Sequence, residues 1–118
     1  MPDPRRGEIW YIYTPGLPRD PHQLRPGLVI SDDTRNRRRD DLLVIPVFST
    51  ARLGPTRVAL RAGTGGIDHD SALFCEEIST IDRDFFVDGP LGPPVPESIL
   101  QSTLRAVRRA LGEVIPEP

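Results

Sequence analysis

The sequence contains no lysine, a single cysteine and only two histidines. Because no Lys-Ser/Thr pair follows the glycine-rich stretch at 63–66, that stretch does not match a phosphate-binding P-loop. The lone Cys75 cannot form an intramolecular disulfide, and its place in Leu73-Phe74-Cys75 favours a small buried hydrophobe in a reducing cytoplasm. No cysteine–histidine spacing fits zinc. We therefore expect neither a metal nor another cofactor.

Long apolar runs are missing as well. No segment approaches the roughly 20 apolar residues that a membrane span needs, and the first seven residues lack the apolar centre of a secretory signal. The length of 118 residues suits one domain, with an ordinary 37% of hydrophobic and 27% of charged residues. We expect a single cytoplasmic domain over residues 1–118, without membrane contact.

What the chain does contain is a series of short apolar segments separated by turn-forming residues. Their β-branched and aromatic content predicts strands. Pro26 suits the first residue of its strand, and Pro46 indicates an edge strand or a bulge, because proline donates no ladder hydrogen bond. The segment at 79–84 suits a single turn capped by Ser79 or Thr80. The predicted strands are 8–13, 26–30, 42–48, 57–60, 71–76 and 85–88.

One helix is expected, near the C-terminus. Leu100, Leu104, Val107 and Leu111 recur at helical spacing and form one apolar stripe. Antiparallel strands closed by a single helix predict an α+β domain, in the form of a small, partly open barrel.

Most catalytic constellations are absent. His22 and His69 lie far apart in polar loops, so a two-histidine acid/base pair is not favoured. In Asp68-His69-Asp70, alternation along an extended chain would point the histidine away from both aspartates, and a turn is preferred to a metal site. Glu76 and Glu77 are adjacent and, in a strand, face opposite sides. The two carboxylates are therefore not expected to act together as a general acid and a general base.

The remaining candidates for catalysis are an arginine at the start of one predicted strand and hydroxyls at the end of the next. If strands 26–30 and 42–48 are antiparallel neighbours, Arg25 and Ser49-Thr50 lie at the same end of the sheet. Arginine suits a phosphodiester because its fork of donors is always charged. It can stabilise the negative charge that develops when a phosphodiester is cleaved. The alternative for Arg25 is a surface ion pair with Asp20.

The arginines are unevenly placed. Four of them fall within residues 35–39, although the net charge of −2 gives the whole molecule no general attraction to nucleic acid. This stretch is either a solvated loop or a surface that contacts RNA.

Taken in order, several segments resemble the MazF/PemK family of toxin endoribonucleases. The similarity runs from about residue 5 to residue 112. The matching segments are Arg6-Gly7-Glu8-Ile9-Trp10, Arg25-Pro26-Gly27-Leu28-Val29-Ile30-Ser31, Asn36-Arg37, Val44-Ile45-Pro46-Val47, Gly54-Pro55-Thr56, Asp70-Ser71, Cys75-Glu76-Glu77-Ile78, Ile81-Asp82 and the helix from Leu104 to Leu111.

The resemblance implies an SH3-like barrel of the kind also seen in CcdB, and a homodimer. It also implies metal-independent cleavage of single-stranded RNA at a short sequence, with a 5′-OH product, and a cognate MazE-like antitoxin that blocks the RNA groove.

Family roles carry over to individual residues of this chain. Arg25 matches the catalytic arginine, Ser49 or its neighbour Thr50 the catalytic hydroxyl, and Glu76 an acidic position that would hold the arginine in place. The residues expected to contact RNA are Asp20, His22, Gln23, Arg35, Arg37 and Arg52.

A non-catalytic toxin or interaction module on the same fold is the alternative. A gyrase poison of the CcdB type carries a tryptophan near its C-terminus. The only tryptophan of this chain is Trp10, in the first predicted strand, which favours the ribonuclease.

Overall fold

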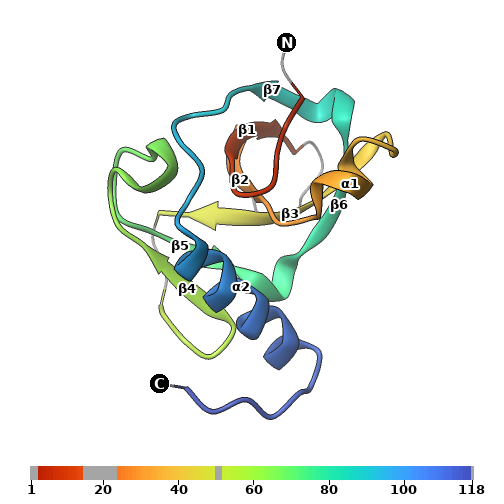
Figure 1. The fold of residues 1–118 in the computed structure, drawn as a ribbon. Coiled ribbons are helices and arrows are strands. Elements are labelled where there is room, and N and C mark those ends of the chain that lie inside the picture. Colours follow the sequence, from red (N-terminus) through yellow and green to blue (C-terminus); the bar gives the residue numbers. More distant parts are fainter. Residues whose placement is uncertain (1–2, 15–23, 50–51, 118) are drawn as a thin grey trace.

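The computed structural model describes residues 3–14, 24–49 and 52–117, shown in Figure 1. Within these residues the chain forms seven strands, two α-helices and three 3₁₀ turns. The elements are β1 (Ile9–Tyr13), β2 (Leu24–Val29), α1 (Asp33–Asn36), β3 (Asp41–Phe48), β4 (Arg57–Leu60), η1 (Thr64–Gly66), β5 (Ser71–Phe74), η2 (Cys75–Glu77), β6 (Ser79–Asp82), η3 (Arg83–Phe85), β7 (Phe86–Asp88) and α2 (Glu97–Ala110).

The strands form one open antiparallel sheet in the order β4-β5-β3-β2-β1-β7, with β6 paired to β3 off this path. In Figure 1 the strongly curved β1 and β2 face β4 and β5 across the interior, and α2 lies beside β4 and β5. The predicted α+β fold, an antiparallel and partly open sheet with a C-terminal helix, is confirmed.

The interpretation of Pro46 as the mark of an edge strand or a bulge is wrong. β3 is central: it pairs with β2 on one side and with both β6 and β5 on the other. On that second side, β6 pairs with residues 41–44 and β5 with residues 47 and 48. Pro46 lies between the two partners, so its missing N–H interrupts neither ladder. Pro26 is the third residue of β2 rather than its first.

The stretch from 75 to 85 also differs from the prediction. β5 ends at Phe74, and Cys75–Glu77 is a 3₁₀ turn, so Glu76 and Glu77 do not alternate across a strand. Residues 79–82 form β6 instead of a capped turn. The cap of the following turn is Asp82, whose carboxylate accepts a hydrogen bond from the Asp84 amide at 2.9 Å.

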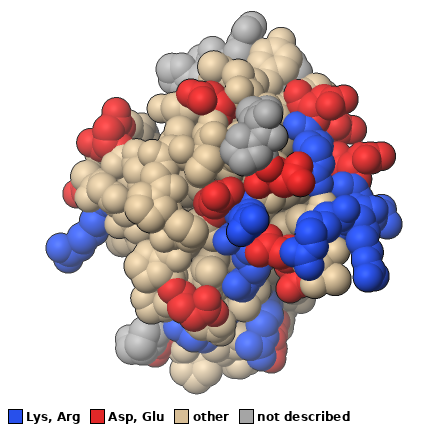
Figure 2. All heavy atoms as spheres, turned by 45° about the horizontal axis from the view of Figure 1, so that its top comes forward, with Lys and Arg blue, Asp and Glu red and all other residues tan. Residues whose placement is uncertain are grey.

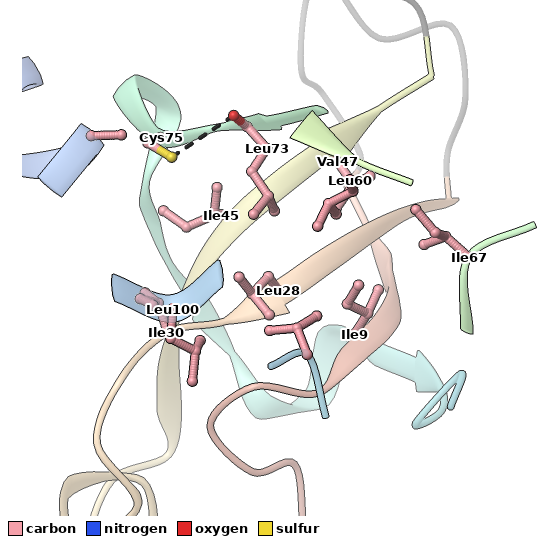
Figure 3. Close-up of a cluster of buried hydrophobic side chains, with 12 residues drawn as sticks. Ile9, Leu28, Ile30, Ile45, Val47, Leu60, Ile67, Leu73, Cys75 and Leu100 are labelled. Carbon is pink, nitrogen blue, oxygen red and sulfur yellow. Dashed lines mark hydrogen bonds between the residues drawn. The ribbon is translucent and has the colours of Figure 1, made fainter. Parts of the chain in front are cut away.

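The larger buried cluster lies between the sheet and α2, and Figure 3 shows its side chains converging from β1, β2, β3, β4, β5 and α2. Ile9, Leu28, Ile45 and Leu73 are fully buried there. Cys75 is buried among them, and this desolvation, with a smaller effect from the charge of Glu76, raises the pKa of its thiol to about 12. The prediction that Cys75 is a small buried hydrophobe is confirmed.

The predicted C-terminal helix is confirmed as α2, but its buried face is shifted. Leu100, Thr103 and Ala106 are the buried residues, whereas Leu111 lies at the C-cap and is 80% exposed. The stripe therefore ends one turn earlier than the leucine spacing predicts. Among the described residues, no helix has the length and apolar content needed to cross a membrane.

Candidate active site

Arg25 is the second residue of β2 and is half-buried. Its Nη1 donates a hydrogen bond to the Val47 carbonyl at 3.3 Å, and its guanidinium carbon lies 4.2 Å from the centre of the Phe48 ring. The β2–β3 register includes Gly27 opposite Pro46, and continuing it by two residues puts Arg25 opposite Phe48. The predicted antiparallel pairing thus brings Arg25 to the end of β3.

Two hollows share Arg25 as part of their lining. The larger, which we call the apolar groove, has a volume of about 430 Å³. Three aromatic residues line it, Tyr13, Phe48 and Phe85, together with aliphatic residues of β1 and β3. Its charged lining residues are Arg25 and Glu77. The guanidinium therefore lies beside a surface wide enough for flat apolar groups.

The smaller space, which we call the polar hollow, has a volume of about 200 Å³. Arg25, Ser49, Asp68 and His69 all line it. His69 Nδ1 and Asp68 Oδ1 are 2.5 Å apart. Arg25, Ser49 and His69 thus all line one space, which is large enough for a phosphodiester group.

His69 is the residue whose place the sequence reasoning missed. The sequence predicts only that His69 belongs to a turn. In the structure it lies just before β5, whose residue Ala72 pairs with Phe48 at the end of β3. That pairing carries the segment ahead of β5 past the end of β3 and into the polar hollow. The place of His69 could have been predicted only by recognising that the strands 42–48 and 71–76 are neighbours in the sheet.

Ser49 follows directly after β3 and is exposed. Successive side chains of a strand point to opposite faces, and the side chain on the Arg25 face at the end of β3 is the phenyl ring of Phe48. Ser49 instead lines the polar hollow. Arg25 also lines this hollow, while its guanidinium lies against the Phe48 ring.

Glu76 is not brought to Arg25, because its carboxylate is held by two other residues. Oε1 accepts a hydrogen bond from Arg57 Nε at 2.9 Å, and Oε2 accepts one from the Thr56 hydroxyl at 2.6 Å. These hydrogen bonds hold the pKa of the Glu76 carboxyl below its usual value. The expectation that Glu76 contacts and holds the Arg25 guanidinium therefore needs correction: the arginine it holds is Arg57.

The arginines expected to contact RNA lie in two places. Arg35 pairs with Asp41 at 2.5 Å, and Arg37 is exposed at the end of α1. Because Asp41 begins β3, the Arg35–Asp41 pair lies roughly 24 Å along the strand from Phe48, which contacts Arg25. Figure 2 shows arginines gathered where Figure 1 places α1, interleaved with acidic residues. Arg52 is exposed, and its carbonyl accepts a hydrogen bond from Arg57 Nη1 at 2.9 Å.

The other predicted site residues, Asp20, His22, Gln23 and Thr50, lie outside the described residues. Within residues 3–14, 24–49 and 52–117, no three His, Cys, Asp or Glu side chains cluster in a way that would hold a metal ion. The groups that the described chain offers a substrate are therefore a guanidinium, a hydroxyl, an imidazole and an aromatic surface.

Comparison with known families decides what kind of protein carries this site. The model of the PemK-like, MazF-like toxins of type II toxin–antitoxin systems matches residues 5–115. The chain belongs to this family. The family that the sequence segments resemble is thereby confirmed.

Individual relatives agree. The endoribonuclease EndoA of Bacillus subtilis is 31% identical over 88 residues, which cover 71% of this chain and 75% of that protein. Among solved structures, a mycobacterial endoribonuclease in complex with its cognate antitoxin is 26% identical with a TM-score of 0.75, over 96% of this chain and 99% of that one. MazF of Deinococcus radiodurans shares the fold at 23% identity, with a TM-score of 0.78 over 96% of this chain and 100% of its own.

Proposed function

We propose that this family member is an endoribonuclease that cuts single-stranded RNA at a short sequence without a metal ion, and so inhibits growth as the toxin of a toxin–antitoxin pair. The observation that carries the proposal is that Arg25, Ser49 and His69 line one hollow at the end of β3. The endoribonuclease relatives in Bacillus and mycobacteria support the reaction class.

The chemistry follows from what these groups can do. The RNA 2′-OH attacks the adjacent phosphorus, the P–O5′ bond breaks, and the products are a 2′,3′-cyclic phosphate and a 5′-OH. Negative charge builds up on the non-bridging oxygens during the attack. The Arg25 guanidinium neutralises it with donors in a fixed plane, and removal of one such donor costs roughly 10²- to 10³-fold in kcat in other enzymes. The hydroxyl of Ser49 or Thr50 hydrogen-bonds the same phosphate.

Proton transfer needs a third group, because a guanidinium does not give up its proton and a serine hydroxyl is a weak base. His69 lines the polar hollow with Arg25, and its Nδ1 contacts Asp68, which leaves Nε2 for the substrate. An imidazole oriented by a carboxylate is a common arrangement for a general acid or base. We assign to His69 the removal of the 2′-OH proton as the P–O2′ bond forms, and the return of that proton to the 5′ oxygen as the P–O5′ bond breaks.

The apolar groove supports recognition of single-stranded RNA. Unpaired bases stack on aromatic side chains, which is the usual way in which proteins hold single strands. Tyr13 and Phe85 line the groove and are 36% and 42% exposed. Asp20, His22, Gln23, Arg35, Arg37 and Arg52 are the further RNA contacts that we propose.

The proposed partners follow from the family. The mycobacterial structure contains a cognate antitoxin, and we propose that a MazE-like antitoxin binds this chain and covers its RNA groove. We also propose that the toxin acts as a homodimer in the cytoplasm.

The test is direct. The purified chain is incubated with a long single-stranded transcript in EDTA, and the new 5′ ends are mapped by primer extension and by phosphorylation with a kinase. We expect cuts at one short sequence and 5′-OH ends. A requirement for a divalent metal contradicts the mechanism, and absence of any cut favours the non-catalytic CcdB-like alternative. Comparing Ser49→Ala with Thr50→Ala identifies the catalytic hydroxyl.

A further inference from the structure

A row of four side chains crosses four neighbouring strands and ends at Arg25. The guanidinium carbon of Arg25 on β2 lies 4.2 Å from the centre of the Phe48 ring on β3. The Phe48 and Phe74 ring centres are 4.4 Å apart, and the guanidinium carbon of Arg57 on β4 lies 4.0 Å from the centre of the Phe74 ring on β5. Because the strand order is β4-β5-β3-β2, the row is continuous across the sheet.

Each ring in the row has a neighbour on either side. Phe48 projects from β3, between β2 and β5, so Arg25 approaches it from one side and Phe74 from the other. Phe74 lies in the same way between Phe48 and Arg57. Both cations are within the roughly 6 Å at which a charge is attracted to an aromatic face. The tilt of one ring therefore limits the tilt of the next.

The end of the row away from Arg25 is fixed by hydrogen bonds. Arg57 donates from Nε to Glu76 at 2.9 Å and from Nη1 to the Arg52 carbonyl at 2.9 Å. Glu76 in turn accepts from the Thr56 hydroxyl at 2.6 Å. Two hydrogen bonds on different nitrogens set the plane of the Arg57 guanidinium, and that plane lies against Phe74.

We propose that Arg57, held by Glu76, is a positioning residue that sets the orientation of the catalytic Arg25 through Phe74 and Phe48. An arginine side chain has many rotamers, and a phosphate accepts its donors only in a narrow range of orientations. Catalytic groups must be held to roughly 0.5 Å and 10–20°. The row limits the Arg25 guanidinium to the plane that the Phe48 ring allows.

The kinetic test rests on the proposed ribonuclease function. It uses the full chain and one RNA oligonucleotide containing the mapped site. Arg57→Gln and Phe74→Leu are expected to lower kcat by about 10- to 100-fold, the loss typical of a misplaced catalytic group. KM should change less than about twofold, because neither Arg57 nor Phe74 lines the apolar groove or the polar hollow. Phe74→Tyr keeps the aromatic ring, so its kcat should stay within about threefold of the wild-type value.

Arg61→Gln is the matched control, since Arg61 is an exposed arginine that follows β4 at its other end. It removes the same charge as Arg57→Gln, outside the row. If Arg61→Gln lowers kcat as much as Arg57→Gln, the effect is one of general charge and the proposal is wrong. A rise in KM with an unchanged kcat in Arg57→Gln also overturns it, because that result assigns Arg57 to RNA binding.

A second readout needs no RNA cleavage. The Nε–Hε resonance of Arg25, assigned by its loss in Arg25→Lys, reports the ring current of Phe48 in the free protein. We expect it to move towards the position of an unstacked arginine in Phe74→Leu and Arg57→Gln, and to stay in place in Arg61→Gln. An unmoved resonance in both row variants, with a folded amide spectrum, overturns the positioning role even if the wild type cuts no RNA. Arg57→Gln changes a partly exposed side chain, so it keeps the test open if Phe74→Leu does not fold.

Discussion

Glu76→Gln is the most informative substitution, because it tests whether the Glu76 carboxylate holds Arg57 and Thr56 in place. The substitution removes the negative charge of the carboxylate, which accepts hydrogen bonds from Arg57 at 2.9 Å and from Thr56 at 2.6 Å. Hydrogen bonds to charged groups contribute about 1.5–3 kcal/mol, and exposed ion pairs only about 0.2–1 kcal/mol. The Arg57 and Glu76 side chains are 29% and 37% exposed, so we expect a loss of about 1 kcal/mol in the free energy of unfolding at pH 7.

The pH dependence has a definite sign. The pKa of the Glu76 carboxyl is lowered in the folded protein from its ordinary 4.5. The stabilisation is therefore fully present above about pH 4.5 and is lost as the pH falls through the lower, folded value. Glutamine does not titrate, so the difference between wild type and Glu76→Gln should be constant from pH 7 to pH 5 and shrink below that.

Urea unfolding at a series of pH values from 7 to 3 measures this difference. For a slope of about 2 kcal/mol/M, the expected loss lowers the urea midpoint by about 0.5 M at pH 7. Glu117→Gln makes the same charge change at an exposed position and should leave the midpoint within about 0.1 M. An equal loss at pH 7 and pH 3 would refute the reasoning, because the charge of Glu76 would then play no part.

Three further outcomes are expected. Cys75 should not react with an aromatic disulfide reagent at pH 8 until urea unfolds the chain, because it is fully buried with its pKa raised to about 12; prompt reaction in the native state contradicts its place in the core. Asn36→Ala should lower the free energy of unfolding by about 2 kcal/mol in urea titrations, since buried Asn36 bonds the carbonyl and hydroxyl of Ser31; a loss under about 0.5 kcal/mol contradicts that network. His69→Ala should lower kcat by about 100-fold with little change in KM, and an unchanged kcat would remove His69 from the reaction.

Much of the fold could be predicted from local pattern. Strands 9–13, 57–60 and 71–74 are bounded by turn residues, and the spacing of Leu100 and its neighbours marks the helix. The errors arose where distant partners decide the structure. Pro46 is tolerated in a central strand because β6 and β5 divide that side of β3, and neither is near it in sequence.

In the site, too, some features follow from the local sequence and others depend on distant strands. Arg25 stands out locally, as a charge beside a proline before a buried run. Its neighbours Phe48, Phe74 and Arg57 come from three other strands, and each of them alone resembles an ordinary half-buried strand residue. Their relation depends on the strand order β4-β5-β3-β2, which no local pattern contains. Glu76 was for that reason matched with the wrong arginine.

The central claim is that Arg25 stabilises the charge formed when RNA is cut without a metal. The most direct measurement is the single-turnover cleavage rate of an RNA oligonucleotide in EDTA, for the wild type, Arg25→Ala and the control Arg61→Ala. We predict metal-free cleavage with 5′-OH ends, a loss of about 10³-fold or more in Arg25→Ala, and an unchanged rate in Arg61→Ala. An Arg25→Ala rate equal to that of the wild type, or cleavage that stops in EDTA, would contradict the claim.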